Sequence, residues 1–458
     1  GDSVMSYFNI VAQTNENTVV TEYEPVKKRS DSYQSEAALE NEFIHMLEEQ
    51  GYEYLSLHTE DELVINLREQ LEKLNNYSFT NKEWKRFLVE SIANPNEGIK
   101  EKTRKIQEDY IQVLKRDDGT SKNIILLDKK DIHHNYLQVI HQYEVSKEHG
   151  AKHDNRYDVT VLVNGFPLVH IELKRRGVPI REAFNQVERY QRDSFGTGYG
   201  LFEYVQIFVI SNGTNSKYYS NTTRYNTGAN LAKSKKEKTS NSFEFTSYWA
   251  DAKNNIISDL IDFTRTFFAR HTILNILTKY CVFTSEEMLL VMRPYQITAT
   301  ERIINRIEIA TNYKKYGSAA GGGYIWHTTG SGKTPFKAAR LATTLPYIEK
   351  VLFVVDRQDL DYQTMREYDR FEKGSANSNR STAVLKKQLE DDNAKIIITT
   401  IQKLSTFVKK NPNHPIYQKH LVIIFDECHR SQFGEAQKNL TRKFKKYYQF
   451  GFTGTPIF

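Results

Sequence analysis

The feature that most constrains the fold is a set of short, uninterrupted apolar runs rich in β-branched residues. They span residues 351–355 (VLFVV), 396–399 (IIIT) and 421–425 (LVIIF). Strands buried on both faces have this continuous apolar pattern, and they occur in parallel sheets whose two faces are covered by helices. We therefore predict an α/β domain with a parallel sheet in the C-terminal part of the chain.

The bulk composition is that of an ordinary globular protein. The 458 residues leave room for two or three domains, with 39% hydrophobic and 26% charged residues. No apolar run approaches the ~18 residues that span a membrane, and no signal peptide is evident, so we expect no membrane association. Cys281 and Cys428 offer no disulfide framework, which favours a reducing, intracellular compartment. A net charge of +6 permits a nucleic-acid partner without establishing one.

Helical patterns alternate with other segments in the N-terminal part. Residues 35–50 place apolar side chains at helical spacing behind Ser35, a typical cap, and residues 84–92 and 180–192 predict two further helices. Residues 226–242 are polar and basic with few apolar groups, which is typical of a loop.

A β-hairpin is predicted between the second and third of these helices. Two β-branched runs, residues 157–163 and 168–173, flank the dipeptide Asn164-Gly165. This dipeptide favours the two-residue turn that joins antiparallel strands. Residues 205–210 predict another buried strand, so we expect an α/β fold here as well.

A glycine-rich segment, residues 327–334 (HTTGSGKT), directly follows the apolar strand pattern of residues 324–326. Backbone N–H groups of such a loop surround a phosphate at a helix N-terminus. Lys333 would reach the β and γ phosphates of ATP, and Thr334 would bind magnesium. His327 stands where the usual pattern has its first glycine. The predicted ATP-binding residues of the loop are Thr329, Gly330, Ser331, Gly332, Lys333 and Thr334.

Two carboxylates stand at the end of the apolar run at residues 421–425. Ligands gather at the carboxyl ends of strands in open α/β sheets. Asp426 would hold the magnesium ion of the nucleotide, and Glu427 would polarise the attacking water. The position after a buried strand argues against an ordinary surface Asp-Glu pair.

A second set of charged residues is brought together by the predicted hairpin. Its turn returns the chain so that Asp158 lies beside Glu172 and Lys174. Two carboxylates and an ammonium are the minimum set for Mg²⁺-assisted phosphodiester hydrolysis, with Asp158 and Glu172 as metal ligands. Gln186 and Tyr190 follow, one helical turn apart and on one face. The alternative is a group of charged residues on an exposed hairpin.

The first predicted helix also carries acidic residues. Glu36, Glu40 or Glu42 could supply a further carboxylate to the metal, but we interpret them as a solvated helix face.

The C-terminal motifs resemble those of superfamily-two helicases and translocases. Residues 327–334, 426–429 and 453–456 are similar to motifs I, II and III of that family. The resemblance implies a RecA-like motor domain. It also implies roles for Gln296 at adenine, His429 in the ATP site, Arg357 and Thr400 on the DNA backbone, and Thr453 and Thr455 in coupling nucleotide state to DNA grip.

The N-terminal set resembles the PD-(D/E)xK nuclease core, in the variety with a glutamine-x-x-x-tyrosine helix; the usual proline before Asp158 is replaced by Tyr157. A nuclease of this type fused to such a motor resembles the R (HsdR) subunit of type I restriction endonucleases. The resemblance implies ATP- and Mg²⁺-dependent translocation and cleavage of double-stranded DNA in the prokaryotic cytoplasm. It also implies specificity (S) and modification methyltransferase (M) subunits as partners.

The predicted organisation is therefore two-part. Residues 1–260 form a PD-(D/E)xK endonuclease domain, a mixed sheet flanked by helices, and residues 261–458 form the first RecA-like motor domain. The second motor domain and the C-terminal region are expected to be absent from this chain. The alternative function is a superfamily-two helicase whose N-terminal domain binds nucleic acid without cutting it.

Overall fold

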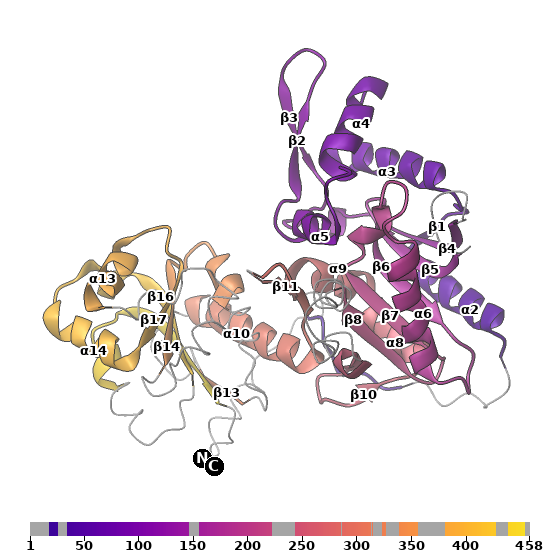
Figure 1. The fold of residues 1–458 in the computed structure, drawn as a ribbon. Helices are drawn as coiled ribbons and strands as arrows, with labels where there is room; N and C mark the ends of the chain where they lie inside the picture. Colours follow the sequence, from indigo (N-terminus) through magenta and orange to yellow (C-terminus); the bar gives the residue numbers. More distant parts are fainter. Residues whose placement is uncertain are drawn as a thin grey trace, which may run out of the picture. The chain divides into compact units, whose positions relative to one another are not determined.

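The structure is a computed structural model. It describes residues 18–25, 34–145, 155–221, 243–284, 286–312, 314, 323–326, 339–355, 381–426 and 438–453. The chain divides into two compact units (Figure 1): one comprises Val19–Phe283 with Glu287–Pro294, and Tyr295–Phe458 makes up most of the other. Residues 226–242, the predicted loop, lie outside the described residues.

The first unit extends past the predicted boundary at residue 260. Helix α8 (Leu260–Phe267) packs against α2 (Glu36–Glu49), and the rings of Phe43 and Phe268 meet edge to face at 5.4 Å. Residues 261–283, which the sequence pattern assigned to the motor, therefore belong to the first unit by their contacts.

A mixed sheet of eight strands forms the centre of the first unit, in the order β1-β4-β5-β6-β7-β8-β9-β10. The pairs β1–β4 and β6–β7 are parallel, and the other neighbours are antiparallel. The strands are β1 (Glu53–Tyr54), β4 (Leu137–Val145), β5 (Asn155–Val163), β6 (Phe166–Leu173), β7 (Ile207–Ser211), β8 (Ser216–Ser220), β9 (Ser247–Ala250) and β10 (Ile256–Ile257). The predicted mixed sheet is confirmed.

Helices flank this sheet and begin where capping residues allow. Ser35 Oγ accepts the N–H of Ala38 at 3.1 Å at the start of α2, as predicted. Thr80 and Glu83 form a capping box at the next predicted helix. The remaining helices are α3 (Glu60–Asn75), α4 (Asn81–Phe87), α5 (Ile99–Gln107), α6 (Ile180–Asp193) and α9 (Arg270–Lys279). Figure 1 shows α6 lying along β6 and β7, which it contacts.

The predicted hairpin is confirmed as β5–β6. Asn164 and Gly165 both have positive φ, 52° and 85°, as a type I′ turn requires. A Cβ at Gly165 would come within 2.7 Å of Leu67 Cα, so only glycine fits there. Asn164 is fully buried, and its side-chain oxygen accepts the N–H of Tyr136 at 2.9 Å. Local turn chemistry and close packing thus fix the hairpin together.

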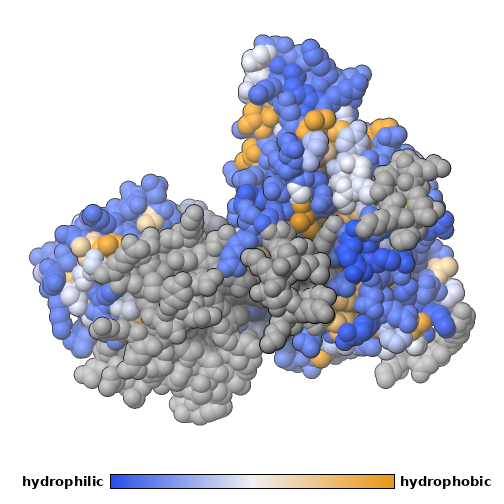
Figure 2. Space-filling model, viewed as in Figure 1, coloured by the Kyte–Doolittle hydropathy of each residue, from blue (hydrophilic) through white to orange (hydrophobic). Residues whose placement is uncertain are grey.

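Two small antiparallel ribbons complete this unit. One pairs β2 (Ile111–Lys115) with β3 (Ser121–Ile125), and the other pairs β11 (Cys281–Phe283) with β12 (Leu289–Val291). In the view of Figure 2 the described surface is mainly hydrophilic with scattered hydrophobic patches. The exposed large hydrophobic residues are Ile65, Val89, Ile111, Val113, Tyr199, Phe245 and Ile256.

The second unit contains the predicted parallel sheet. Five strands lie in the order β13-β17-β16-β14-β15, and every neighbouring pair is parallel. The elements are α10 (Pro294–Asn312), β13 (Gly323–Trp326), β14 (Lys350–Val355), α13 (Thr382–Glu390), β15 (Ile396–Thr400), α14 (Ile401–Lys410), β16 (His420–Asp426) and β17 (Lys446–Thr453). All three apolar runs that predicted this sheet are strands of it.

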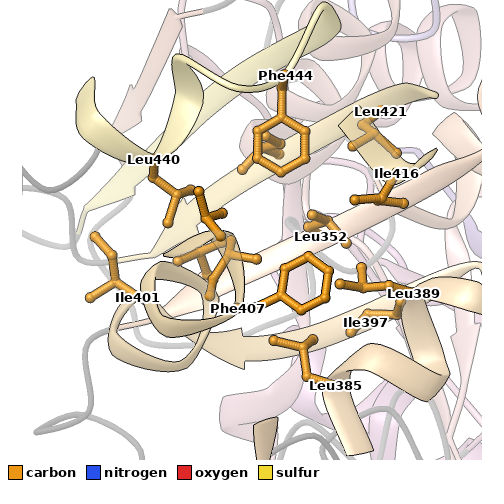
Figure 3. Close-up of a cluster of buried hydrophobic side chains, with 14 of the residues drawn as sticks. Leu352, Leu385, Leu389, Ile397, Ile401, Phe407, Ile416, Leu421, Leu440 and Phe444 are labelled. Carbon is orange, nitrogen blue, oxygen red and sulfur yellow. The ribbon is translucent and has the colours of Figure 1, made fainter. Parts of the chain in front are cut away.

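One hydrophobic cluster covers a face of this sheet (Figure 3). Leu352, Ile397 and Leu421 come from the strands, and Leu385 and Phe407 come from α13 and α14. All five side chains are fully buried. The cluster explains why the strand side chains on this face are apolar, since the helices exclude water from it. No helix in the described part of the chain combines the length and apolar character needed to cross a membrane.

Candidate active site

Asp158 and Glu172 lie where the hydrogen-bonded ladder between β5 and β6 ends. The pairing of the two strands stops at Val159 and Ile171. Beyond that point side chains replace the backbone partners. The N–H of Leu173 donates to Asp158 Oδ2 at 2.8 Å, and the N–H of Asp158 donates to Glu172 Oε1 at 3.4 Å. The hairpin therefore brings the two predicted carboxylates into adjacent positions.

Burial governs the electrostatics of this pair. The side chain of Glu172 is 1% exposed. Burial, followed by the charge of Glu172, raises the pKa of Asp158, and burial also raises the pKa of Glu172. Lys174 acts in the opposite direction on Glu172 through its positive charge. Two adjacent carboxyls, one fully buried and one half-buried, favour holding a proton between them, and a bound cation would replace that proton.

Lys174 begins a chain of hydrogen bonds that returns to the same strand as Asp158. Its Nζ donates to Gln186 Oε1 at 3.2 Å, and Gln186 Nε2 donates to the Tyr190 hydroxyl at 2.6 Å. The hydroxyl of Tyr190 in turn donates to the carbonyl of Arg156 at 2.8 Å. The three predicted residues Lys174, Gln186 and Tyr190 are thus in contact, and they connect α6 to β5.

Asp158 lines a hollow of about 460 Å³ between α2 and the sheet. Its walls are Glu36, Ala37, Glu40, Asn41, His141, Gln142, Asp158 and Leu173. Glu40 is only 7% exposed. His141 Nδ1 lies 2.9 Å from its Oε1, and Gln142 Nε2 donates to Oε2 at 2.8 Å. For Glu40 the predicted solvated helix face is wrong, because two polar side chains of β4 bury its carboxylate.

The strand opposite Asp158 is irregular. Gln142 has a φ of 53° and makes no ladder pair, although His141 and Tyr143 on either side of it pair with β5. This left-handed residue faces Asp158 across the register and donates to Glu40. The backbone irregularity therefore lies at the candidate site.

His170 is a site residue that the sequence pattern did not reveal. Its Nε2 lies 3.1 Å from Glu172 Oε1, and its ring is fully buried. Burial lowers the pKa of His170 to about 4, so the ring is neutral at pH 7. The available signal was its place two positions before Glu172 on one strand, since alternate residues share a face.

In the second unit, the strand ends that lead into three of the predicted motor motifs lie at one edge of the parallel sheet. Strands β13, β16 and β17 end at Trp326, Asp426 and Thr453, and parallel strands have their carboxyl ends on the same side. The glycine-rich loop follows Trp326 directly. This is the edge at which α/β sheets bind ligands.

Two of the motor residues can be described further. Gln296 lies in the first turn of α10 and is buried. Thr400 is the last residue of β15, and its hydroxyl caps α14 by accepting the N–H of Lys403 at 3.1 Å. Outside the described residues lie Thr329, Gly330, Ser331, Gly332, Lys333, Thr334, Arg357, Glu427, His429 and Thr455.

Two family models match separate parts of the chain. Residues 33–227 match the family described as "Type I restriction enzyme R protein N terminus", and residues 295–458 match "SWI2/SNF2 ATPase". The type I restriction enzyme EcoprrI endonuclease subunit of Escherichia coli is 50% identical over 299 residues, which are 65% of this chain and 90% of that protein. The chain belongs to this family of endonuclease subunits. The resemblance drawn from the motifs is confirmed.

Longer relatives match this chain as well. A type I restriction enzyme endonuclease subunit of Staphylococcus saprophyticus is 41% identical over 436 residues, covering 93% of this chain but 43% of the relative. A putative one of Methanocaldococcus jannaschii is 25% identical over 394 residues, covering 81% of this chain and 36% of the relative. The chain thus spans less than half the length of these two relatives.

Proposed function

We propose that this chain provides the nuclease site and the ATP-driven motor of a type I restriction enzyme, which moves along double-stranded DNA and cuts it. The observation that carries the proposal is the pair of half-buried Asp158 and fully buried Glu172 beside the Lys174–Gln186–Tyr190 chain. A helicase with a purely binding N-terminal domain has no need for two adjacent acids largely removed from water, because their desolvation costs stability.

The donor set fits Mg²⁺. Carboxylate oxygens are the ligands that Mg²⁺ prefers, and this ion usually keeps several waters instead of filling its shell from the protein. Among the residues that the structure describes, no group of three or more His, Cys, Asp and Glu side chains is placed to hold a metal ion. Asp158 and Glu172 would therefore hold the ion as a pair. Positions would remain for water and a phosphate oxygen.

The residues around the pair have complementary roles. A bound Mg²⁺ would polarise the scissile phosphate and lower the pKa of its water. Lys174 stabilises the negative charge that develops on the phosphate. Gln186 accepts one N–H of the Lys174 ammonium, which has three donors, and so orients the others. Tyr190 fixes the amide of Gln186 from behind.

The motor half of the proposal rests on the strand ends described above. ATP would bind at Lys333 and Gln296, with Mg²⁺ at Thr334 and Asp426. Glu427 would polarise the attacking water. His429 would complete the ATP site, and Arg357 and Thr400 would contact the DNA backbone. Thr453 and Thr455 would couple the nucleotide state to the grip on DNA. Further partners in the proposal are the specificity and modification subunits, which would supply sequence recognition in a prokaryotic cytoplasm.

The test uses the full-length subunit assembled with its specificity and modification subunits on supercoiled plasmid DNA. Asp158→Ala should abolish cutting but leave DNA-stimulated ATP turnover in place, because it removes a ligand of the nuclease metal only. Lys333→Ala should abolish both ATP turnover and cutting. The exposed Lys130 provides a matched lysine control, since Lys130→Ala removes a cation that belongs to neither set of predicted site residues. Plasmid cleavage by the Asp158→Ala enzyme would overturn the assignment.

A further inference from the structure

We propose that His170 is a positioning residue of the nuclease site, which holds one oxygen of Glu172 so that the other oxygen is presented to the divalent cation. The inference rests on the proposed metal-dependent nuclease function.

The geometry around Glu172 is asymmetric. His170 Nε2 lies 3.1 Å from Oε1, and the N–H of Asp158 reaches the same Oε1 at 3.4 Å. Two donors from different strands thus converge on one oxygen and fix the plane of the carboxylate. Oε2 is then the oxygen that can serve a cation. A free carboxylate would rotate and offer either oxygen, so the contact restricts how Glu172 binds.

The surroundings of His170 argue against a role in packing alone. Aromatic rings enclose the imidazole, with centroids of Tyr157 at 5.5 Å, Phe195 at 5.6 Å and Tyr190 at 6.2 Å. The ring is fully buried, and its Nδ1 makes no hydrogen bond within the described part of the chain. An imidazole in such a site leaves one polar nitrogen unsatisfied, which an apolar side chain would avoid. The interaction that offsets this cost is the hydrogen bond to Glu172.

This arrangement sets the tautomer. With Nδ1 unpartnered, Nε2 carries the proton and donates it to Glu172 Oε1. A glutamine at position 170 can place its amide N–H where Nε2 stands, whereas an asparagine is one methylene too short. Methionine has the length of glutamine but no donor. These three side chains therefore separate hydrogen bonding from size and from polarity.

The experiment measures binding of Mn²⁺ alone, without nucleotide or DNA, to the full-length subunit by calorimetry. His170→Gln should bind Mn²⁺ like the native protein. His170→Asn and His170→Met should each weaken binding by about 10-fold or more, as the loss of an outer-shell partner does. The half-saturating Mn²⁺ concentration for plasmid cutting by the assembled enzyme should rise in the same variants. Circular dichroism establishes that each variant is folded.

The outcomes separate the two levels of the proposal. If all three variants bind Mn²⁺ equally, whether as native or equally weakened, the positioning role is overturned, since a donor at position 170 then makes no difference. The Asp158→Asn variant is the reference: it should lose this Mn²⁺ site. If it binds Mn²⁺ as the native protein does, the proposed metal site itself is wrong, whatever the His170 variants show. If His170→Asn does not fold, His170→Gln and His170→Met alone make the same comparison.

Discussion

Replacing Asp158 by asparagine should remove a pH dependence from the stability of the metal-free protein. Burial, followed by the charge of Glu172, raises the pKa of Asp158 from 3.8 to about 9. The folded protein therefore holds a proton on this carboxyl that the unfolded chain has already released. A raised pKa contributes stability that is complete below pH 3.8 and is lost as the pH rises toward 9. Asparagine cannot ionise, so the Asp158→Asn variant should not show this loss of stability.

The magnitude follows from proton counting. Between the two pKa values the folded state holds one more proton than the unfolded state, so the free energy of unfolding falls by about 1.4 kcal/mol per pH unit. From pH 6 to pH 8 the native protein should lose about 2.7 kcal/mol through this carboxyl. This loss of stability comes from the one extra proton of the folded state. It does not depend on how far the pKa of Asp158 is raised, provided that this pKa stays above 8 in the folded state.

Urea unfolding in EDTA at pH 6 and pH 8 measures the effect. Trp84 and Trp249 are buried in the first unit and report its unfolding by fluorescence. Asp109→Asn, at an exposed aspartate of the same unit, should keep the native pH dependence. If the native protein and Asp158→Asn lose the same stability between pH 6 and pH 8, the carboxyl is not protonated in the folded state and the argument fails.

Three further predictions concern individual contacts. Lys174→Ala should lower the rate of plasmid cutting by about 100-fold or more and leave ATP turnover unchanged. Tyr190→Phe should lower the cutting rate less, because Gln186 keeps its bond to Lys174. Initial rates of cutting and of ATP turnover test both statements. Glu40→Ala should lower the free energy of unfolding by about 1–3 kcal/mol because the half-buried donors His141 and Gln142 of β4 lose their buried acceptor. The exposed Glu36→Ala should have little effect in the same urea titration. Lys350 donates to three carbonyls around the end of α13, so Lys350→Met should destabilise the second unit by about 1–3 kcal/mol in urea; an unchanged midpoint would contradict that role.

Local sequence was enough to predict the elements that carry the site. The dipeptide Asn164-Gly165 specifies its own turn. Asp158 lies opposite Glu172 only because the β5–β6 register also shifts by one residue between Val161 and Leu162, which the turn dipeptide does not predict. The apolar runs likewise predicted a parallel sheet, because only strands covered on both faces tolerate such runs. Backbone preference and hydrophobic periodicity act over a few residues, so one sequence reveals them. The catalytic and ATP-binding roles stay predictions.

Only the tertiary structure decides which polar side chains are buried and which residues they contact. Glu40 meets His141 across 101 residues of sequence, and no pattern on the helix distinguishes it from the exposed Glu36. In the sequence His170 is one polar residue within a strand, and only the folded structure shows that aromatic rings from β5 and α6 enclose it. Residues 261–283 join the first unit because α8 packs on α2. Each of these facts depends on contacts between elements distant in sequence, and the periodicity of one segment carries no information about which distant segment will cover it.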